Sequence, residues 1–251
     1  MHRIQLTFLS LVFVCSCSAV YGQWRFSSES GLVFNQYNDV RAPNGDIATG
    51  SFFSFTDDFE ANEPVIFLRL EAGYTFADKH TFLLTAAPLA FNYDNFNGTS
   101  IQFEGRSFES STNLSGHYEF NTYRFSYRYA LLRKEKTRLE LGLTVLLRDA
   151  KISLTQDDVT RENTDLGFVP LISFLLATDL NPKLSFLLVG DALVGPQGRA
   201  EDIFAGFQFD ILNDRLFGKV GYRLIEGGAD VTQVYNFAFF HFFNIGIASE
   251  F

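Results

Sequence analysis

The feature that most constrains this chain is a two-residue alternation of apolar side chains that recurs along most of its length. A period of two places alternate side chains on opposite faces of a strand, whereas a helix repeats every 3.6 residues. In the last repeat, every second residue from Tyr235 to Phe251 lacks a carboxylate, lysine or arginine. The same alternation occurs in segments 66–76, 123–129, 139–147, 203–211 and 216–224. The sequence therefore predicts an all-β protein.

Polar connectors separate these segments, and short and longer connectors alternate. The short ones contain Asp, Asn or Pro, which favour tight turns, and lie at 77–80, 133–137, 179–183 and 213–215. The longer ones lie near 39–63, 94–115, 155–163, 195–200 and 226–231. Four short and five longer connectors predict ten antiparallel strands. Ser27 to Ser30 interrupt the apolar face of the first strand, so about eight or twelve strands are the alternatives.

The opposite face of the strands carries charges of both signs. Six acids and six bases lie there: Arg69, Glu71, Arg124, Arg128, Glu140, Arg148, Asp165, Asp191, Asp202, Asp210, Lys219 and Arg223. Because a buried charge without a partner is costly, we expect these residues to form compensating ion pairs inside a narrow lumen. The same residues could alternatively line a polar path or binding site for a small solute.

Alternation alone does not distinguish a soluble sheet from a membrane barrel, since either can have one apolar face. The unequal connectors and the balanced charges favour an up-and-down transmembrane β-barrel with short periplasmic turns and longer outer loops. Such a sheet must close on itself, because hydrocarbon offers no partner to an unpaired backbone group. The alternative is a soluble periplasmic barrel that binds an apolar ligand.

The chain ends on an aromatic residue, Phe251, and Phe243, Ile245 and Ile247 share its face. This ending resembles the C-terminal signature of bacterial outer-membrane β-barrel proteins. Segments 164–167, 195–200, 226–230 and 234–237 are similar to parts of uncharacterised small barrels of Gram-negative bacteria. The resemblance implies residence in the outer membrane, contact with its lipid and lipopolysaccharide, and recognition of the last strand by the barrel-assembly machinery. It implies no particular activity.

The first residues of the chain are predicted to be a targeting segment. Residues 1–22 contain a basic start, a short apolar run and small residues, which is the plan of a secretory signal peptide. We expect cleavage before Gln23 and a single barrel domain over 23–251. Both cysteines, Cys15 and Cys17, fall within this segment. The alternative is a lipoprotein signal in which Cys17 is acylated.

Composition excludes some functions. The formal net charge of −9 argues against nucleic-acid binding, which requires a basic surface. Residues 39–63 are rich in carboxylates, but they lack the ligand spacing of a known calcium loop. No cofactor motif or metal-ligand pattern is evident, so we expect no cofactor and no metal. We also expect a monomer.

Catalysis is possible in principle through Ser115, His117 and Glu119, which occur close together in the sequence. An enzyme that modifies lipid A or phospholipid would need a hydroxyl, a base and a carboxylate in contact. Strand alternation places these three residues on one face at increasing heights, which does not favour a triad. The principal hypothesis is therefore a structural or surface-interaction protein, or a narrow conduit, and the lipid-modifying enzyme is the alternative.

Overall fold

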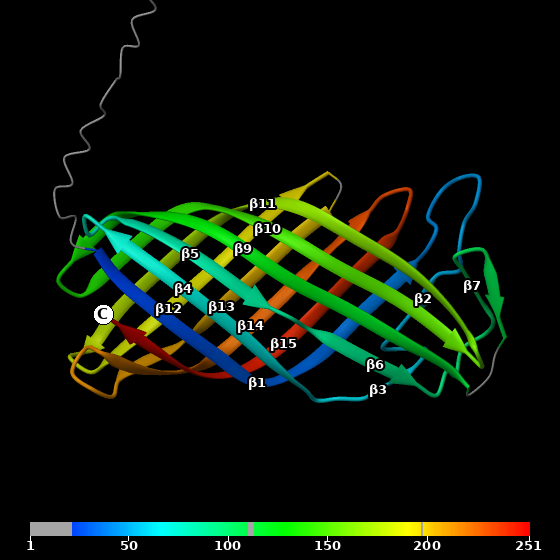
Figure 1. The fold of residues 1–251 in the computed structure, drawn as a ribbon, viewed down its shortest axis with the longest axis horizontal. Coiled ribbons are helices and arrows are strands. Elements are labelled where there is room, and N and C mark those ends of the chain that lie inside the picture. Colours follow the sequence, from blue (N-terminus) through cyan, green and yellow to red (C-terminus); the bar gives the residue numbers. More distant parts are fainter. Residues whose placement is uncertain (1–21, 110–112, 197) are drawn as a thin grey trace, which may run out of the picture.

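The computed structural model describes residues 22–109, 113–196 and 198–251, and no helix occurs in these ranges. No helix there could therefore cross a membrane. The predicted signal peptide lies outside the described residues except for Gly22. Figure 1 shows an elongated barrel of long, tilted strands. Its wall consists of β1 (Gly22–Arg41), β4 (Val65–Phe76), β5 (His80–Ala87), β9 (Leu114–Lys134), β10 (Thr137–Gln156), β11 (Val159–Asn181), β12 (Leu184–Gly195), β13 (Gly198–Asp210), β14 (Leu216–Asp230) and β15 (Tyr235–Glu250).

The wall is a closed antiparallel sheet. The strands follow the chain order around the barrel, and β1 pairs with β15 on one side and β4 on the other. The prediction of ten strands in an up-and-down barrel is confirmed. The first strand belongs fully to the wall despite its polar residues, because Ser27 and Glu29 occupy inward positions and are buried.

The two ends of the barrel differ. Both ends of the described chain and four tight turns lie at one end, which we call the terminal end (Figure 1). Asp78, Asn213 and Asp214 adopt positive φ angles of 55°, 41° and 62° in two of these turns. Asp and Asn tolerate this conformation better than most residues, which explains why the sequence revealed these turns. The five other connectors form the opposite end, which we call the loop end.

Three of the five predicted longer connectors are mostly strand. β10 and β11 continue toward each other until only Asp157 and Asp158 separate them, and β12 and β13 meet in the same way. Only the connectors between β1 and β4 and between β6 and β9 are long. Exposed apolar side chains on the outside of the wall, such as Leu84, Phe125, Leu143 and Ile245, form what we call the apolar belt. The prediction failed because these strands project past the apolar belt, so their outward residues become polar without the strand ending.

The side-chain alternation inverts partway along the strands. Near the terminal end, Leu84, Phe125 and Leu143 face outward and are exposed by 60%, 50% and 66%. Further along β9 and β10, toward the loop end, the inward-facing Tyr118 and Ile152 are buried at 2% and 4% exposure. In β9 and β10, the apolar side chains therefore face outward over one section and toward the protein interior over the other.

The two long connectors fill the interior at the loop end. They contain β2 (Phe53–Ser54), β3 (Glu60–Ala61), β7 (Ile101–Phe103) and β8 (Arg106–Phe108), and β6 (Ala90–Asp94) continues the line of β5 along β9. Buried rings from these segments and from the wall form one cluster, which we call the aromatic plug: Phe53, Phe55, Phe59, Phe91, Tyr93, Phe103, Phe108, Tyr118 and Phe240. The sequence predicted ion pairs inside the lumen, and the buried cluster at this end is apolar.

Aromatic side chains also form a row outside the barrel at the terminal end. Trp24 packs on Tyr74 with ring centroids 4.8 Å apart, and Phe76 stacks on His80 at 4.7 Å. His80 in turn donates to or accepts from the hydroxyl of Tyr127 at 2.9 Å. Girdles of aromatic residues mark the interfaces of membrane barrels, because their rings are apolar and their edges polar.

Candidate functional site in the barrel lumen

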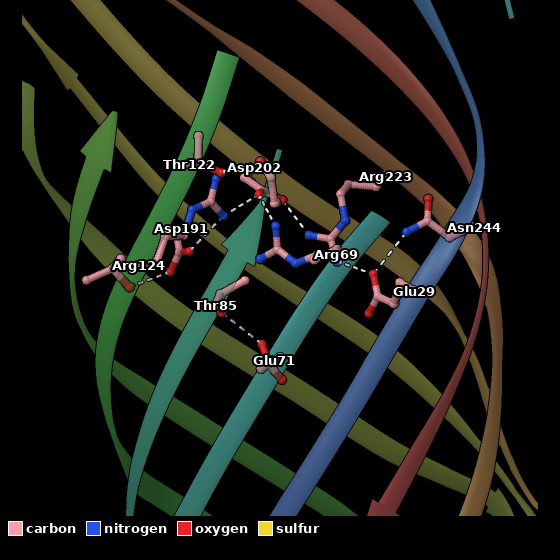
Figure 2. Close-up of polar contacts among 12 residues, drawn as sticks. Glu29, Arg69, Glu71, Thr85, Thr122, Arg124, Asp191, Asp202, Arg223 and Asn244 are labelled. Atoms are coloured by element: carbon pink, nitrogen blue, oxygen red, sulfur yellow. Dashed lines mark hydrogen bonds and ion pairs between the residues drawn. The ribbon is translucent and has the colours of Figure 1, made fainter. Parts of the chain in front are cut away.

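The lumen contains a cluster of buried ion pairs centred on Asp202 of β13. Arg69 of β4 donates from Nη1 to Oδ2 of Asp202 at 3.0 Å. Arg124 of β9 and Arg223 of β14 also donate to this carboxylate. β4 and β9 lie across the barrel from β13 in the strand order, so these contacts cross the lumen (Figure 2). One carboxylate therefore ties together three sides of the wall.

A second carboxylate, Glu29 of β1, extends the cluster. It accepts from Nη2 of Arg223 at 2.8 Å and from Nδ2 of Asn244 at 3.0 Å (Figure 2). It also accepts from Nζ of Lys219 at 3.1 Å. The sequence analysis missed Glu29, because it lies in the polar run of the first strand. Glu29 lies two residues from Ser27 and from Gly31, so these three share one face of the strand, and Phe26 and Ser28 lie on the other face. This alternation was the signal that could have revealed Glu29 as an inward residue.

Hydrogen bonds from neutral side chains complete the cluster. Asp191 of β12 lies 3.3 Å from Nη1 of Arg124 and accepts from the hydroxyl of Thr144 at 2.8 Å. Arg128 donates from Nε to Ser173 at 2.8 Å, and Glu71 accepts from Thr85 at 3.4 Å. Such bonds matter because a charge removed from water needs several partners to offset the cost of its desolvation.

We define the central cluster as Glu29, Arg69, Arg124, Asp191, Asp202, Lys219 and Arg223. Other charges predicted for the lumen lie away from it. Arg148 pairs with Asp165 on neighbouring strands, and Glu140 lies 3.5 Å from Arg138. Asp210 accepts from the backbone N–H of Asp214 at 3.1 Å in the turn after β13. The structure therefore brings six of the twelve predicted residues together, namely Arg69, Arg124, Asp191, Asp202, Lys219 and Arg223. The other six make local contacts outside the central cluster.

A polar cavity of about 370 Å³ occupies the lumen between the central cluster and the terminal end. Its lining extends from Lys134 and Lys183 at the turns to Arg69 and Asp202 in the cluster. Toward the loop end, a smaller cavity of about 60 Å³ lies beside Tyr118, Arg124 and Arg148, and the aromatic plug packs in the same end of the barrel. The polar cavity therefore reaches the terminal end of the barrel, whereas the buried core cluster lies at the loop end.

The three candidate catalytic residues lie on the outward face of β9 beyond the apolar belt. His117 contacts Oε1 of Glu119 through Nε2 at 2.8 Å and Oδ1 of Asn92 through Nδ1 at 2.7 Å. The hydroxyl of Ser115 donates to the backbone oxygen of Thr155 at 3.4 Å. Both ring nitrogens of His117 are thus engaged by other groups, and neither is directed at Ser115.

Glu119 also pairs with Nζ of Lys151 at 2.7 Å. The hydrogen bond from Lys151 lowers the pKa of Glu119 below its ordinary value, and a second bond from His117 acts in the same direction. The carboxylate is therefore held in its charged form as part of a surface ion pair, which does not favour a role as a proton donor. Among the described residues, no group of three or more His, Cys, Asp or Glu side chains is arranged to hold a metal ion.

The residues proposed as an assembly signal lie on the outer surface of the last strand. Phe243, Ile245 and Ile247 of β15 face outward and are more than half exposed. Phe251 follows the strand and exchanges two backbone hydrogen bonds with Trp24 of β1, at 2.9 and 3.1 Å. The end of the chain is thus fixed at the seam where the barrel closes.

No family model and no curated protein matches this sequence. Solved structures do match its fold. The outer-membrane protease OmpT of Escherichia coli aligns with a TM-score of 0.53 and 8% identity, over 91% of this chain and 97% of that chain. The attachment invasion locus protein Ail of Yersinia pestis aligns at 0.37 and 10% identity, over 90% and 98%. Neisserial surface protein A aligns at 0.35 and 12%, over 92% and 99%.

The first of these structures, OmpT, is an outer-membrane protein, and its fold is shared over most of this chain. The chain has the fold of an outer-membrane β-barrel, as the C-terminal resemblance predicted. At such low identity the likeness concerns the fold alone, so the protease activity of the first structure is a property of that protein.

Proposed function

We propose that this chain is an outer-membrane barrel with a structural and surface-interaction role, and that it does not conduct ions. The observation that carries the proposal is the aromatic plug, which closes the loop end with rings that make direct contact. Phe55 stacks on Tyr93 with centroids 4.5 Å apart, and Phe91 stacks on Phe240 at 5.2 Å. An open channel requires a continuous hydrated path, and packed rings exclude water from this section.

The central cluster supports the same proposal. Its side chains are at most 9% exposed and connect strands on different sides of the barrel. An ion moving through the lumen would have to displace several of these pairs, each of which is held by further hydrogen bonds. We interpret the cluster as a cross-brace that holds the lumen closed.

The surface role is supported by the charge of the loop end. Residues 42–64 contain Asp46, Asp57, Asp58, Glu60 and Glu63, and no lysine or arginine. Two of these carboxylates support the loop itself: Asp58 accepts from the backbone N–H of Ser54 and Glu60 from the side chain of Asn95. An acidic, folded cap of this kind favours positively charged partners over polyanions.

The exterior supports the proposed membrane partners. The apolar belt and the aromatic row are suited to lipid, and the polar exterior beyond the belt is suited to the lipopolysaccharide head-group region. The outward row of Phe243, Ile245 and Ile247 would be presented to the assembly machinery during insertion. Closure of the sheet within one chain supports a monomer, because no second copy is needed to complete the barrel.

Planar-bilayer recording tests the absence of conduction. We expect the purified protein to insert without steady ion current, because the plug and the cluster both block the lumen. A stable current in the wild type would contradict the proposal and favour the conduit. In that event, Arg124→Gln and Arg223→Gln should change the ion selectivity if the path runs through the cluster.

Cysteine labelling of intact bacteria tests the orientation and the location. Ile47 is fully exposed in the loop-end connector, and the side chain of Asp78 is 91% exposed in a turn at the terminal end. We expect a membrane-impermeant maleimide to label Ile47→Cys on intact cells and to label Asp78→Cys only after the outer membrane is opened. The reverse labelling pattern would mean that the barrel has the opposite orientation in the membrane. Recovery of the protein in the soluble periplasmic fraction would favour the soluble alternative.

A further inference from the structure

The barrel wall is interrupted on one side, between β4 and the line of β5 and β6. The pairing of β4 with β5 runs from Phe76 with His80 to Leu70 with Ala86 and ends there. β4 continues to Val65 while it pairs with β1, and the pairing on β9 resumes only at Ala90 of β6. In the described chain, residues 65–69 therefore have no strand partner on this side. Figure 1 shows β5 ending in mid-barrel before β6 begins.

The sequence at the interruption explains it. Pro88 follows β5 and has no N–H with which to extend the ladder. On its other side, this segment is held to β9: Thr122 donates to the oxygen of Ala87 at 3.4 Å, and the N–H of Leu89 donates to Asn121 at 3.3 Å. The break is therefore a supported feature of the wall.

The break has defined borders, and we call it the side window. Its two sides are residues 65–69 of β4 and residues 87–89. On the side of the terminal end, the window is bounded by the pair of Leu70 with Ala86. On the side of the loop end, it is bounded by the hydrogen bond from the N–H of Asn62 to the oxygen of Asn92, at 3.0 Å. Non-helical backbone without strand partners is tolerated in hydrocarbon only where it lines a cavity or is covered by protein.

An apolar groove on the outer surface borders the side window. The groove has a volume of about 780 Å³ and crosses eight strands, from β14, β15 and β1 over β4, β5 and β9 to β10 and β11. Its lining includes Leu70 and Ala86, the pair that bounds the window on the side of the terminal end, and the small residue Ala72. The flanking Leu84 and Phe125 are larger, so the alanines create the hollow.

A second, smaller pocket lies directly behind the side window. It measures about 20 Å³ and is lined by Leu68, Pro88 and Leu89 of the window and by the interior residues Phe120, Thr122, Ile225 and Phe242. Arg69 and Arg223 of the central cluster form its remaining wall. The groove thus meets the window at the pair of Leu70 with Ala86, and the small pocket lies on the inner side of the window.

From this arrangement we infer that the groove binds the hydrocarbon chain of a membrane lipid and that the chain end reaches the interior through the side window. The groove is continuous with the apolar belt, so the material in contact with it is lipid. Its lining is almost entirely apolar, which suits an alkyl chain and excludes a polar solute. The small inner pocket limits entry to the chain end.

Two single-cysteine variants test this inference, since the described chain contains no cysteine. Thr122 lines the inner pocket and is 2% exposed. Ser173 of β11 also faces the lumen and is 0% exposed, but it lies behind a fully paired wall. The probe is a phospholipid with a maleimide at the end of one acyl chain, mixed into phosphatidylcholine vesicles that contain the folded protein.

We expect the lipid probe to modify Thr122→Cys at least about tenfold faster than Ser173→Cys. A charged, water-soluble thiol reagent should modify both slowly. Adding Ala87→Leu, which places a larger side chain at the window, should slow Thr122→Cys to the rate of the control. Heat-modifiable gel migration establishes that each variant is folded.

Equal rates for the two cysteines with the lipid probe would overturn the inference. Faster modification of Thr122→Cys by the water-soluble reagent would also overturn it, because the route would then be aqueous. Neither result would bear on ion conduction, so this inference and the proposed function fail independently.

Discussion

Replacing Asp202 by asparagine is expected to lower the free energy of unfolding by about 3–5 kcal/mol, because it leaves three arginines around a neutral amide. Arg69, Arg124 and Arg223 all donate to this one carboxylate. Asparagine keeps nearly the same shape, so the change removes charge with little change in packing. The measurement is a urea titration of the protein folded in detergent micelles or vesicles.

The matched control is Asp165→Asn, which also removes one acid from an arginine pair. The side chain of Asp165 is 42% exposed and contacts Arg148 alone among the cations. We expect a loss of at most about 1 kcal/mol there, as is typical for solvent-exposed pairs. If both variants lost the same small amount of stability, the central cluster would not be the cross-brace that we propose.

Replacing Phe53 by alanine is expected to cost about 3–5 kcal/mol, the usual range when a buried phenylalanine is truncated. Phe53 is 2% exposed and lies within 6.2 Å, between ring centroids, of Phe55, Phe59 and Phe103. The variant should also become sensitive to trypsin at Arg106, because the connectors that form the plug would open locally. Urea titration and limited proteolysis measure the two effects.

The neighbouring Phe52 provides a control within the same connector. Its ring is 52% exposed and lies outside the plug, beneath the guanidinium of Arg41 at 5.7 Å. We expect Phe52→Ala to cost about 1 kcal/mol or less, as for an exposed cation–π contact. Equal effects at the two positions would mean that the interior packing of the loop end contributes little to stability.

Much of the fold could be predicted because the apolar belt follows a local rule. Within the belt, apolar side chains point outward and charged side chains point inward, so apolar residues recur at every second position of a strand. Leu141, Leu143 and Val145 of β10 are an example. Asp and Asn in the turns at the terminal end marked where those strands reverse. Beyond Leu147, an apolar residue no longer marks the outward face of β10, because the apolar belt ends there and the inward Ile152 is buried instead.

The candidate site could be predicted less completely. Arg69, Arg124, Asp191, Asp202 and Arg223 were recognised as inward charges from their phase in the strands. Which charge contacts which could not be derived, because it depends on how ten strands are staggered around the barrel. Glu29 was missed because its own strand lacks a clear apolar face, so the sequence did not show which of its residues point inward.

The sequence by itself determined the all-β class, the outward apolar positions of the belt and most of the charges that turn inward, because each depends on neighbours two residues apart. The tertiary structure alone decided that the loop end is sealed by aromatic rings, that one carboxylate gathers three arginines, and that the wall opens beside Pro88. These features bring together residues far apart in the chain. Their contacts depend on the closure and stagger of the barrel, which no local pattern encodes.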